Sequence, residues 1–142
     1  MKTLKHSLII LAMMIITIKV GAHGEDRLGP NGGYIKMPGA FHTELVPAGK
    51  NAFKVYLLDI KWKNASTQNS TVVLSFNSAV KVEAKCEVEK NFYLCNFDPK
   101  LDLTKKGELV IQAKREGQVG NEARYLLPLT LESKTDHSKH KM

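Results

Sequence analysis

Apolar and polar residues alternate with a period of two through most of the chain. In the clearest stretch, residues 80–88, the polar positions are lysines and glutamates, and the apolar positions are Val80, Val82, Ala84, Cys86 and Val88. Successive side chains of a strand point to opposite faces, so this stretch predicts a strand with one apolar and one charged face. No long segment shows the apolar spacing of a helix.

Turn-forming residues separate this strand from several others. The other expected strands cover residues 33–37, 41–46, 53–60, 71–77, 92–97, 108–115 and 123–131. Asp98 and Pro99 favour one short helical turn within 98–107, with aspartate as the N-cap and proline at the first helical position. Seven to eight short strands of this kind predict an all-β fold, an immunoglobulin-like β-sandwich.

The first 22 residues have the features of a secretory signal peptide. A basic start precedes an apolar run over 8–18, and Val20 and Ala22 supply the small residues of a cleavage site. The run is shorter than the roughly 20 residues that a membrane-spanning helix needs. We therefore expect export to the periplasm or the medium, cleavage after Ala22, and no membrane span in the mature chain.

The mature chain is expected to form one domain, since the whole sequence has only 142 residues. We expect a flexible lead-in at 23–32, a sandwich domain at 33–131 and a disordered polar tail at 132–142. Signal cleavage removes three of the 21 basic residues and lowers the net charge from +7 to +4. The remaining lysines alternate with glutamates, which argues against a nucleic-acid partner.

The two cysteines are placed symmetrically about Lys90-Asn91. A two-residue hairpin turn there pairs Cys86 with Cys95, with an expected Cα separation of about 4.5 Å at a non-hydrogen-bonded site. Export permits a disulfide, and the close C-x-x-C spacing of redox and metal sites is absent. The sequence therefore predicts a Cys86–Cys95 disulfide.

Histidines provide the candidate metal chemistry. Cleavage after Ala22 would leave His23 first, where its free amine and imidazole form a chelate suited to copper(II). His42 and Glu44 lie two apart on an expected strand and so share a face. The lead-in spans at most about 33 Å, enough for His23 to reach His42. We expect one copper(II) ion held by the amine and imidazole of His23 and by His42, with Glu44 or water completing the set. Its affinity is expected to fall below about pH 6.5, the ordinary histidine value.

Each of these residues also has a purely structural interpretation. A signal-peptide cut commonly leaves an arbitrary first residue, and a histidine on a sandwich strand is more often solvated or hydrogen-bonded than a metal ligand. His137 and His140 are expected to lie in a solvated tail that binds metal weakly at most. Asn64 and Asn69 begin N-glycosylation acceptor patterns. These asparagines could be modified in a eukaryotic secreted protein, whereas in a bacterium they would only mark an exposed loop.

One resemblance bears on function. Residues 29–33 (GPNGG), 41–46 (FHTELV) and 53–59 (FKVYLLD) resemble a small periplasmic β-domain of heavy-metal efflux adaptors and of short exported proteins. An N-terminal histidine on a small exported sandwich is also similar to periplasmic copper-resistance carriers. These resemblances imply metal binding through His23.

Three functional classes follow. The first is a periplasmic copper-binding carrier or efflux accessory, with a metal ion and an envelope protein as partners. The second is a structural or protein-interaction module of the cell envelope without a metal. An enzyme ranks last, because no serine lies in a nucleophile elbow and the disulfide leaves no cysteine free beside a histidine. We therefore expect a non-enzyme.

Overall fold

A computed structural model describes residues 23–132 of the chain, and the expected signal peptide lies outside this range. The described part is built from strands and contains no helix. The strands are β1 (His23–Gly24), β2 (Tyr34–Met37), β3 (His42–Gly49), β4 (Ala52–Leu58), β5 (Thr71–Asn77), β6 (Lys81–Glu83), β7 (Lys85–Glu89), β8 (Phe92–Asn96), β9 (Glu108–Arg115), β10 (Gln118–Val119) and β11 (Ala123–Leu126).

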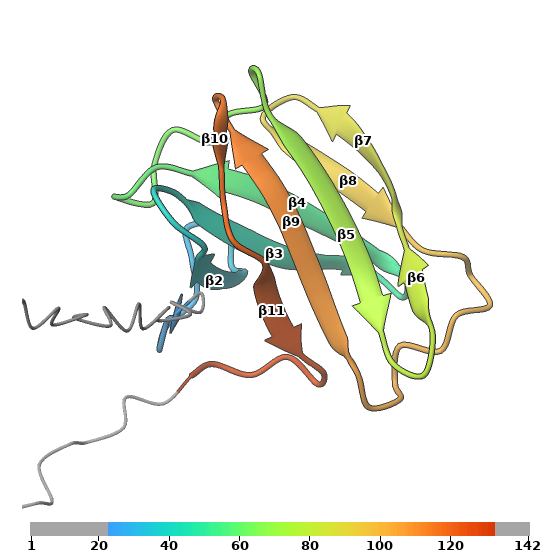
Figure 1. Cartoon of the computed structure of the whole chain (residues 1–142). Helices are drawn as coiled ribbons and strands as arrows, with labels where there is room; N and C mark the ends of the chain where they lie inside the picture. Colours follow the sequence, from blue (N-terminus) through green and yellow to red (C-terminus); the bar gives the residue numbers. More distant parts are fainter. Residues whose placement is uncertain (1–22, 133–142) are drawn as a thin grey trace, which may run out of the picture.

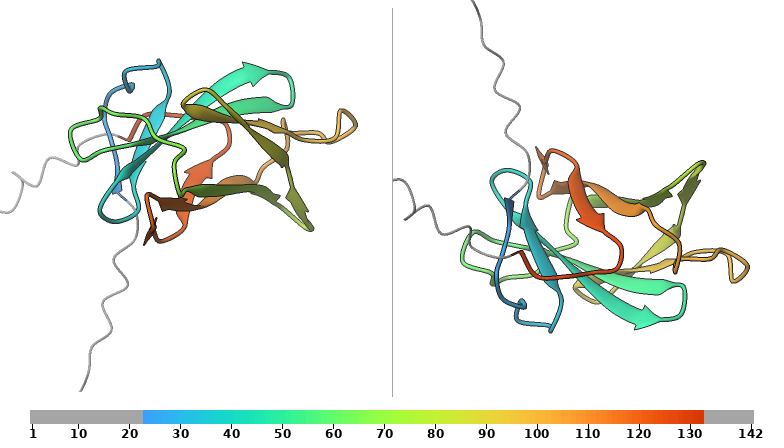
Figure 2. Two further views of the ribbon diagram at one scale, coloured as in Figure 1. Left: turned by 90° about the horizontal axis from the view of Figure 1, so that it is seen from above. Right: turned by 90° about the horizontal axis from the view of Figure 1, so that it is seen from below.

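These strands form two antiparallel sheets that pack face to face (Figures 1 and 2). The first sheet has the order β1-β2-β3-β4-β8-β7, and the second has the order β10-β9-β5-β6 with β11 beside β9. Apolar side chains from both inner faces fill the space between the sheets, among them Phe41, Leu45, Leu57, Leu74, Leu109 and Ile111. The predicted all-β sandwich is confirmed.

With β1, β2, β6 and β10 left out, the remaining seven strands follow an order that also occurs in immunoglobulin domains. If β3, β4, β5, β7, β8, β9 and β11 are lettered A to G, one sheet reads A-B-E-D and the other C-F-G. Two features differ from antibody domains, where a disulfide joins strands B and F and a tryptophan lies on strand C. Here the disulfide joins D to E within one sheet, and Trp62 lies in the loop after β4. The likeness is therefore one of topology.

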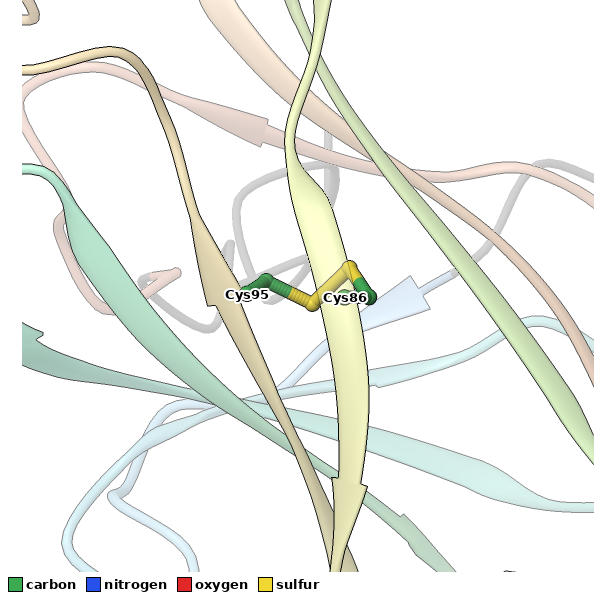
Figure 3. The surroundings of a disulfide bond; sticks show 2 residues. All are labelled: Cys86 and Cys95. Atoms are coloured by element: carbon green, nitrogen blue, oxygen red, sulfur yellow. A yellow bond between two sulfur atoms is a disulfide. The ribbon is translucent and has the colours of Figure 1, made fainter.

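The disulfide has the predicted pairing. Cys86 lies opposite Cys95 in the register of β7 and β8, and their sulfur atoms are bonded at 2.05 Å (Figure 3). The Cα atoms are 4.0 Å apart, close to the expected spacing. Lys90 begins the two-residue turn with a φ of 44°, as tight hairpin turns require. The bond indicates a non-reducing, extracytoplasmic compartment.

The strand predicted over residues 80–88 is divided between the two sheets. β6 pairs with β5 in the second sheet, β7 pairs with β8 in the first, and the amide of Ala84 between them donates to Leu74 O at 2.9 Å. Val82, Ala84 and Cys86 still pack against the core. Val80 and Val88 are 69% and 59% exposed, because they lie at the two ends of the crossing rather than between the sheets.

Two further boundaries differ from the prediction. Residues 98–107 form turns rather than a helical turn, with the Asp98 carboxylate accepting from Lys100 N at 2.8 Å. The strand expected to run to residue 131 ends at Leu126, where pairing with β9 stops. Leu127 N then donates to Gly107 O at 3.0 Å, and Pro128, which follows a cis peptide bond, has no amide hydrogen to offer a partner strand.

The expected flexible lead-in is attached to the first sheet. His23 and Gly24 pair with Met37 and Lys36, and Glu25 N donates to Ile35 O at 3.3 Å. Further along, the predicted glycine-rich turn closes through Gly32 N and Gly29 O at 3.0 Å. These backbone bonds make residues 23–32 part of the domain.

Candidate functional site

The predicted ligand His42 lies on the outer face of the first sheet. It is 3% exposed, next to a small second apolar cluster built around Ile35, Tyr56 and Leu58. Its Nδ1 is 3.1 Å from Asp59 O, and its ring meets Trp62 edge-on with the ring centroids 5.9 Å apart. The histidine is therefore held in one orientation.

This hydrogen bond fixes which ring nitrogen is available. A carbonyl oxygen only accepts, so the His42 Nδ1 carries a hydrogen and donates to Asp59 O. In the neutral ring the lone pair is then on Nε2. Metal-binding histidines commonly have this arrangement, with one ring nitrogen donating to a carbonyl and the other on the metal.

The predicted ligand Glu44 has a structural role. Its side chain is fully buried, and Oε1 accepts from Asn31 N at 2.8 Å and Gly33 N at 3.0 Å, while Oε2 accepts from Asn31 Nδ2 at 2.8 Å. A Cβ added to Gly33 would lie 2.7 Å from Leu45 O, so only glycine brings this amide so close. The carboxylate holds the 29–33 turn against β3, so its oxygens are already engaged in hydrogen bonds.

The strand register places His23 near His42. The backbone of His23 pairs with Met37 on β2, and the last paired residues of β2 and β3 are Lys36 and Thr43. His23 therefore lies two strands away from His42, which begins β3 one residue before Thr43. Neighbouring strands are about 4.8 Å apart, so the backbones of His23 and His42 are separated by roughly 10 Å.

The described side chains contain no complete metal site. Within the part of the chain that the structure describes, no three His, Cys, Asp or Glu residues are grouped to hold a metal ion. Both cysteines are in the disulfide. His137 and His140 lie outside the described residues.

Asp59 and Trp62 complete the surroundings of His42, and neither is among the predicted site residues. Asp59 Oδ1 accepts from Lys61 N and Lys63 N, both at 2.9 Å. The hydrogen bond from Lys63 N is the main reason that the pKa of the exposed Asp59 carboxyl lies below its ordinary value. An aspartate followed by a polar turn is a signal for such a loop.

Trp62 has no comparable sequence signal. It adopts a left-handed φ of 63°, unusual for a bulky residue, and the Arg27 guanidinium lies 4.7 Å from its ring centroid. Trp62 packs on the second apolar cluster and shields His42 from solvent. A local turn, in which Trp62 N donates to Asp59 O at 3.0 Å, and the packing of the ring on the second apolar cluster hold it in this conformation.

Two tyrosines near Glu44 have raised pKa values. Burial is the main cause for Tyr56, and the negative charge of Glu44 adds to it. Burial is also the main cause for Tyr125, whose hydroxyl is 2.7 Å from Thr43 Oγ1. Both phenols stay neutral at physiological pH, and Tyr125 links the second sheet to the first.

Comparison with protein-family models, curated protein sequences and solved structures finds no match for this chain. Residues 23–132 contain no helix long and apolar enough to cross a membrane.

Proposed function

We propose that the mature protein is a small exported carrier, periplasmic or secreted, that binds one copper(II) ion through its own N-terminus. The ligands are the α-amine and imidazole of His23 and the Nε2 atom of His42. The pairing of β1 with β2 and of β2 with β3 carries the proposal, because the backbones of His23 and His42 lie on one sheet with a single strand between them.

Two further observations support this ligand set. The bond from His42 Nδ1 to Asp59 O leaves Nε2 with the lone pair. The set has three nitrogen donors, the kind of ligand that copper(II) prefers. One of them, the amine, arises only through cleavage after Ala22, so the complete set belongs to the processed chain. The resemblance of residues 29–59 to β-domains of heavy-metal efflux adaptors points the same way.

The test compares the authentic mature chain, beginning at His23, with a chain that has one additional N-terminal glycine. The extension moves the amine away from His23, so copper(II) affinity in a chelator-competition titration should fall at least about tenfold. Trp62 is the only tryptophan and lies beside His42, so its fluorescence should be quenched as copper(II) binds.

Two variants complete this experiment. His23→Gln should weaken binding as the extension does, and it changes no side chain of the described core. His42→Gln should also weaken binding, with circular dichroism confirming that the variant is folded. Equal affinity of the authentic and extended chains would refute the N-terminal chelate.

An interaction module of the cell envelope is the second candidate. It is favoured by the hydrogen bonds that already engage one predicted ligand, because the Glu44 carboxylate accepts from the 29–33 turn. In that case the 59–64 loop, with Ile60 63% exposed at its tip, offers an apolar contact for an envelope protein. Failure of the mature chain to bind copper(II) would favour this candidate.

A further inference from the structure

β7 (Lys85–Glu89) is the last strand of the first sheet, and its outer edge is open. It pairs with β8 on one side, and no strand among residues 23–132 pairs with its other side. In Figure 1 the strand lies at the rim of the sandwich. The disulfide between Cys86 and Cys95 fastens it to β8 (Figure 3), so the open edge is held in place.

The geometry of the hairpin shows which backbone groups of β7 face this edge. Glu89 and Phe92 flank the two-residue turn as a hydrogen-bonded pair, and bonded and non-bonded pairs alternate along the strands from there. Cys86 and Cys95 then form a non-hydrogen-bonded pair, and their Cα separation of 4.0 Å agrees with the short spacing of such pairs. The N–H and C=O groups of Cys86 and Val88 therefore point away from β8.

The side chains of β7 give the open edge one charged and one apolar face. Lys85, Glu87 and Glu89 project from the outer face of the sheet and are exposed. Val88 projects from the inner face at the end of the core, and it is 59% exposed. Unpaired backbone groups beside an exposed apolar side chain are a template for a further strand, and the charges decide which strand fits.

We infer that β7 pairs antiparallel with β7 of a second copy of this chain, which joins the two first sheets into one continuous sheet. The two-fold axis passes beside Glu87, so Cys86 lies opposite Val88 of the partner subunit. The same pair forms again on the other side of the axis. Each pair exchanges both of its N–H···O bonds, so the backbone groups that face the edge are satisfied.

Backbone chemistry selects this register among the alternatives. Because strand side chains alternate, shifts by two residues are the ones that keep each face on its own side. One such shift places Val88 opposite Ala84 of the partner subunit, and the Ala84 amide already donates to Leu74 O at 2.9 Å. The opposite shift places Cys86 opposite Lys90 of the partner subunit, a turn residue with a φ of 44°. The proposed register avoids both conflicts.

The charges of β7 favour a second copy as the partner. Lys85 lies opposite Glu89 of the partner subunit, and the two-fold axis forms this attractive pair twice. One like-charge contact, between the two copies of Glu87, lies on the axis. Each Glu87 keeps the ion pair with its own Lys85, at 2.9 Å, which reduces the repulsion. On the inner face the partner strand covers the exposed Val88.

The dimer leaves the proposed copper(II) sites open. β1, which carries His23, is at the opposite end of the same sheet from β7. The inference is therefore independent of metal binding. A contact of five residues from each copy is small, so we expect a weak and reversible dimer.

The experiment is sedimentation equilibrium of the mature chain without copper(II), from about 10 µM to about 1 mM, where the Kd of a weak dimer falls. The wild type should show a monomer–dimer equilibrium. Lys85→Glu replaces both attractive pairs with like charges, so it should raise the Kd about tenfold or more. Lys81→Glu, which makes the same change at an exposed lysine of β6, is the matched control and should leave the Kd unchanged.

Two further variants test the register. Lys85→Glu/Glu89→Lys exchanges the charges of the facing pair and should restore the Kd of the wild type. Glu87→Gln removes the like-charge contact on the axis and should lower the Kd several-fold. Circular dichroism and thermal melting check that each variant folds as the wild type does.

Amide hydrogen exchange tests the backbone bonds directly. The amides of Cys86 and Val88 face the open edge in the monomer, so they should exchange more slowly as the protein concentration rises. The Glu87 amide faces β8 and should exchange at the same rate throughout.

A wild type that stays monomeric at the highest concentration would overturn the inference. A dimer that Lys85→Glu leaves intact would also overturn it, because another surface would then hold the two copies together. If Lys85→Glu weakens the dimer and the charge exchange does not restore it, the antiparallel register centred on Glu87 is wrong.

Discussion

Glu44 stabilises a turn of the fold, although its position in the sequence predicts a metal ligand. A carboxylate two residues from a histidine on a strand is a reasonable pair of metal ligands, but here its oxygens accept three hydrogen bonds from Asn31 and Gly33. These bonds compensate for burying a charged group completely. His42 differs, because its bond to Asp59 orients one ring nitrogen and leaves the other with its lone pair.

Glu44→Ala should lower the free energy of unfolding by about 3 kcal/mol. The variant leaves the buried Gly33 amide without its acceptor, and the 29–33 turn loses the hydrogen bonds that hold it on β3. Denaturant unfolding of the mature protein measures this. Glu87→Ala, on the exposed face of β7, is the matched control and should change stability by less than about 0.5 kcal/mol.

The isosteric Glu44→Gln separates structure from metal binding. It retains one acceptor oxygen, so it should destabilise less than Glu44→Ala, and it should leave copper(II) affinity unchanged. A large loss of copper(II) affinity in a folded Glu44→Gln protein would show that Glu44 is a metal ligand after all.

At the scale of elements, the β7–β8 hairpin is determined locally and the β6–β7 crossing is not. Residues 85–96 contain the hairpin turn, the alternating apolar and polar residues of both strands, and the disulfide that joins the strands. By contrast, the change of sheet at Ala84 depends on β5, whose Leu74 carbonyl accepts the Ala84 amide. The alternation of apolar and polar residues indicates which face of a strand is buried. It does not indicate which sheet provides the partner strand.

The disulfide should stabilise the fold without being required for it. Closing a loop of this length contributes roughly 2 to 3 kcal/mol in the chain-entropy model. For a domain of this size the reduced protein should therefore melt about 10 °C lower, still in a cooperative transition. Differential scanning calorimetry with and without reductant measures the shift, and loss of the folded state on reduction at 25 °C would contradict it.

At the scale of the whole molecule, the distinguishing feature is that the lead-in and the C-terminal segment close against each other. Glu132, Gly24 and Lys36 form the contact. It brings the expected mature N-terminus and the last described residue together beside the first sheet.

Gly24→Ala should displace the Glu132 carboxylate without unfolding the domain, because the atoms in the way belong to the end of a flexible side chain. We expect faster amide hydrogen exchange over residues 24–36 and a loss of stability of about 1 kcal/mol or less. Gly39→Ala is the matched control, since its nearest heavy atom would be 3.9 Å away. Unchanged exchange in the Gly24→Ala protein would show that the Glu132 contact does not order β1.

The sequence by itself determined what depends on neighbouring residues. Alternation and turn residues are local properties, so β5 (Thr71–Asn77) and β9 (Glu108–Arg115) begin and end as predicted, and the cysteines pair as predicted. The all-β class follows from the same patterns.

Only the tertiary structure decided the features that join distant segments. The Glu44 contact spans 11 to 13 residues, the His42–Asp59 contact 17, and the Gly24–Glu132 contact 108. Each depends on which strands become neighbours, which a period-two pattern leaves open because it defines faces and not partners. For that reason the sequence identified the histidines as candidate ligands, while only the strand pairing placed the backbone of His23 on the same sheet as His42.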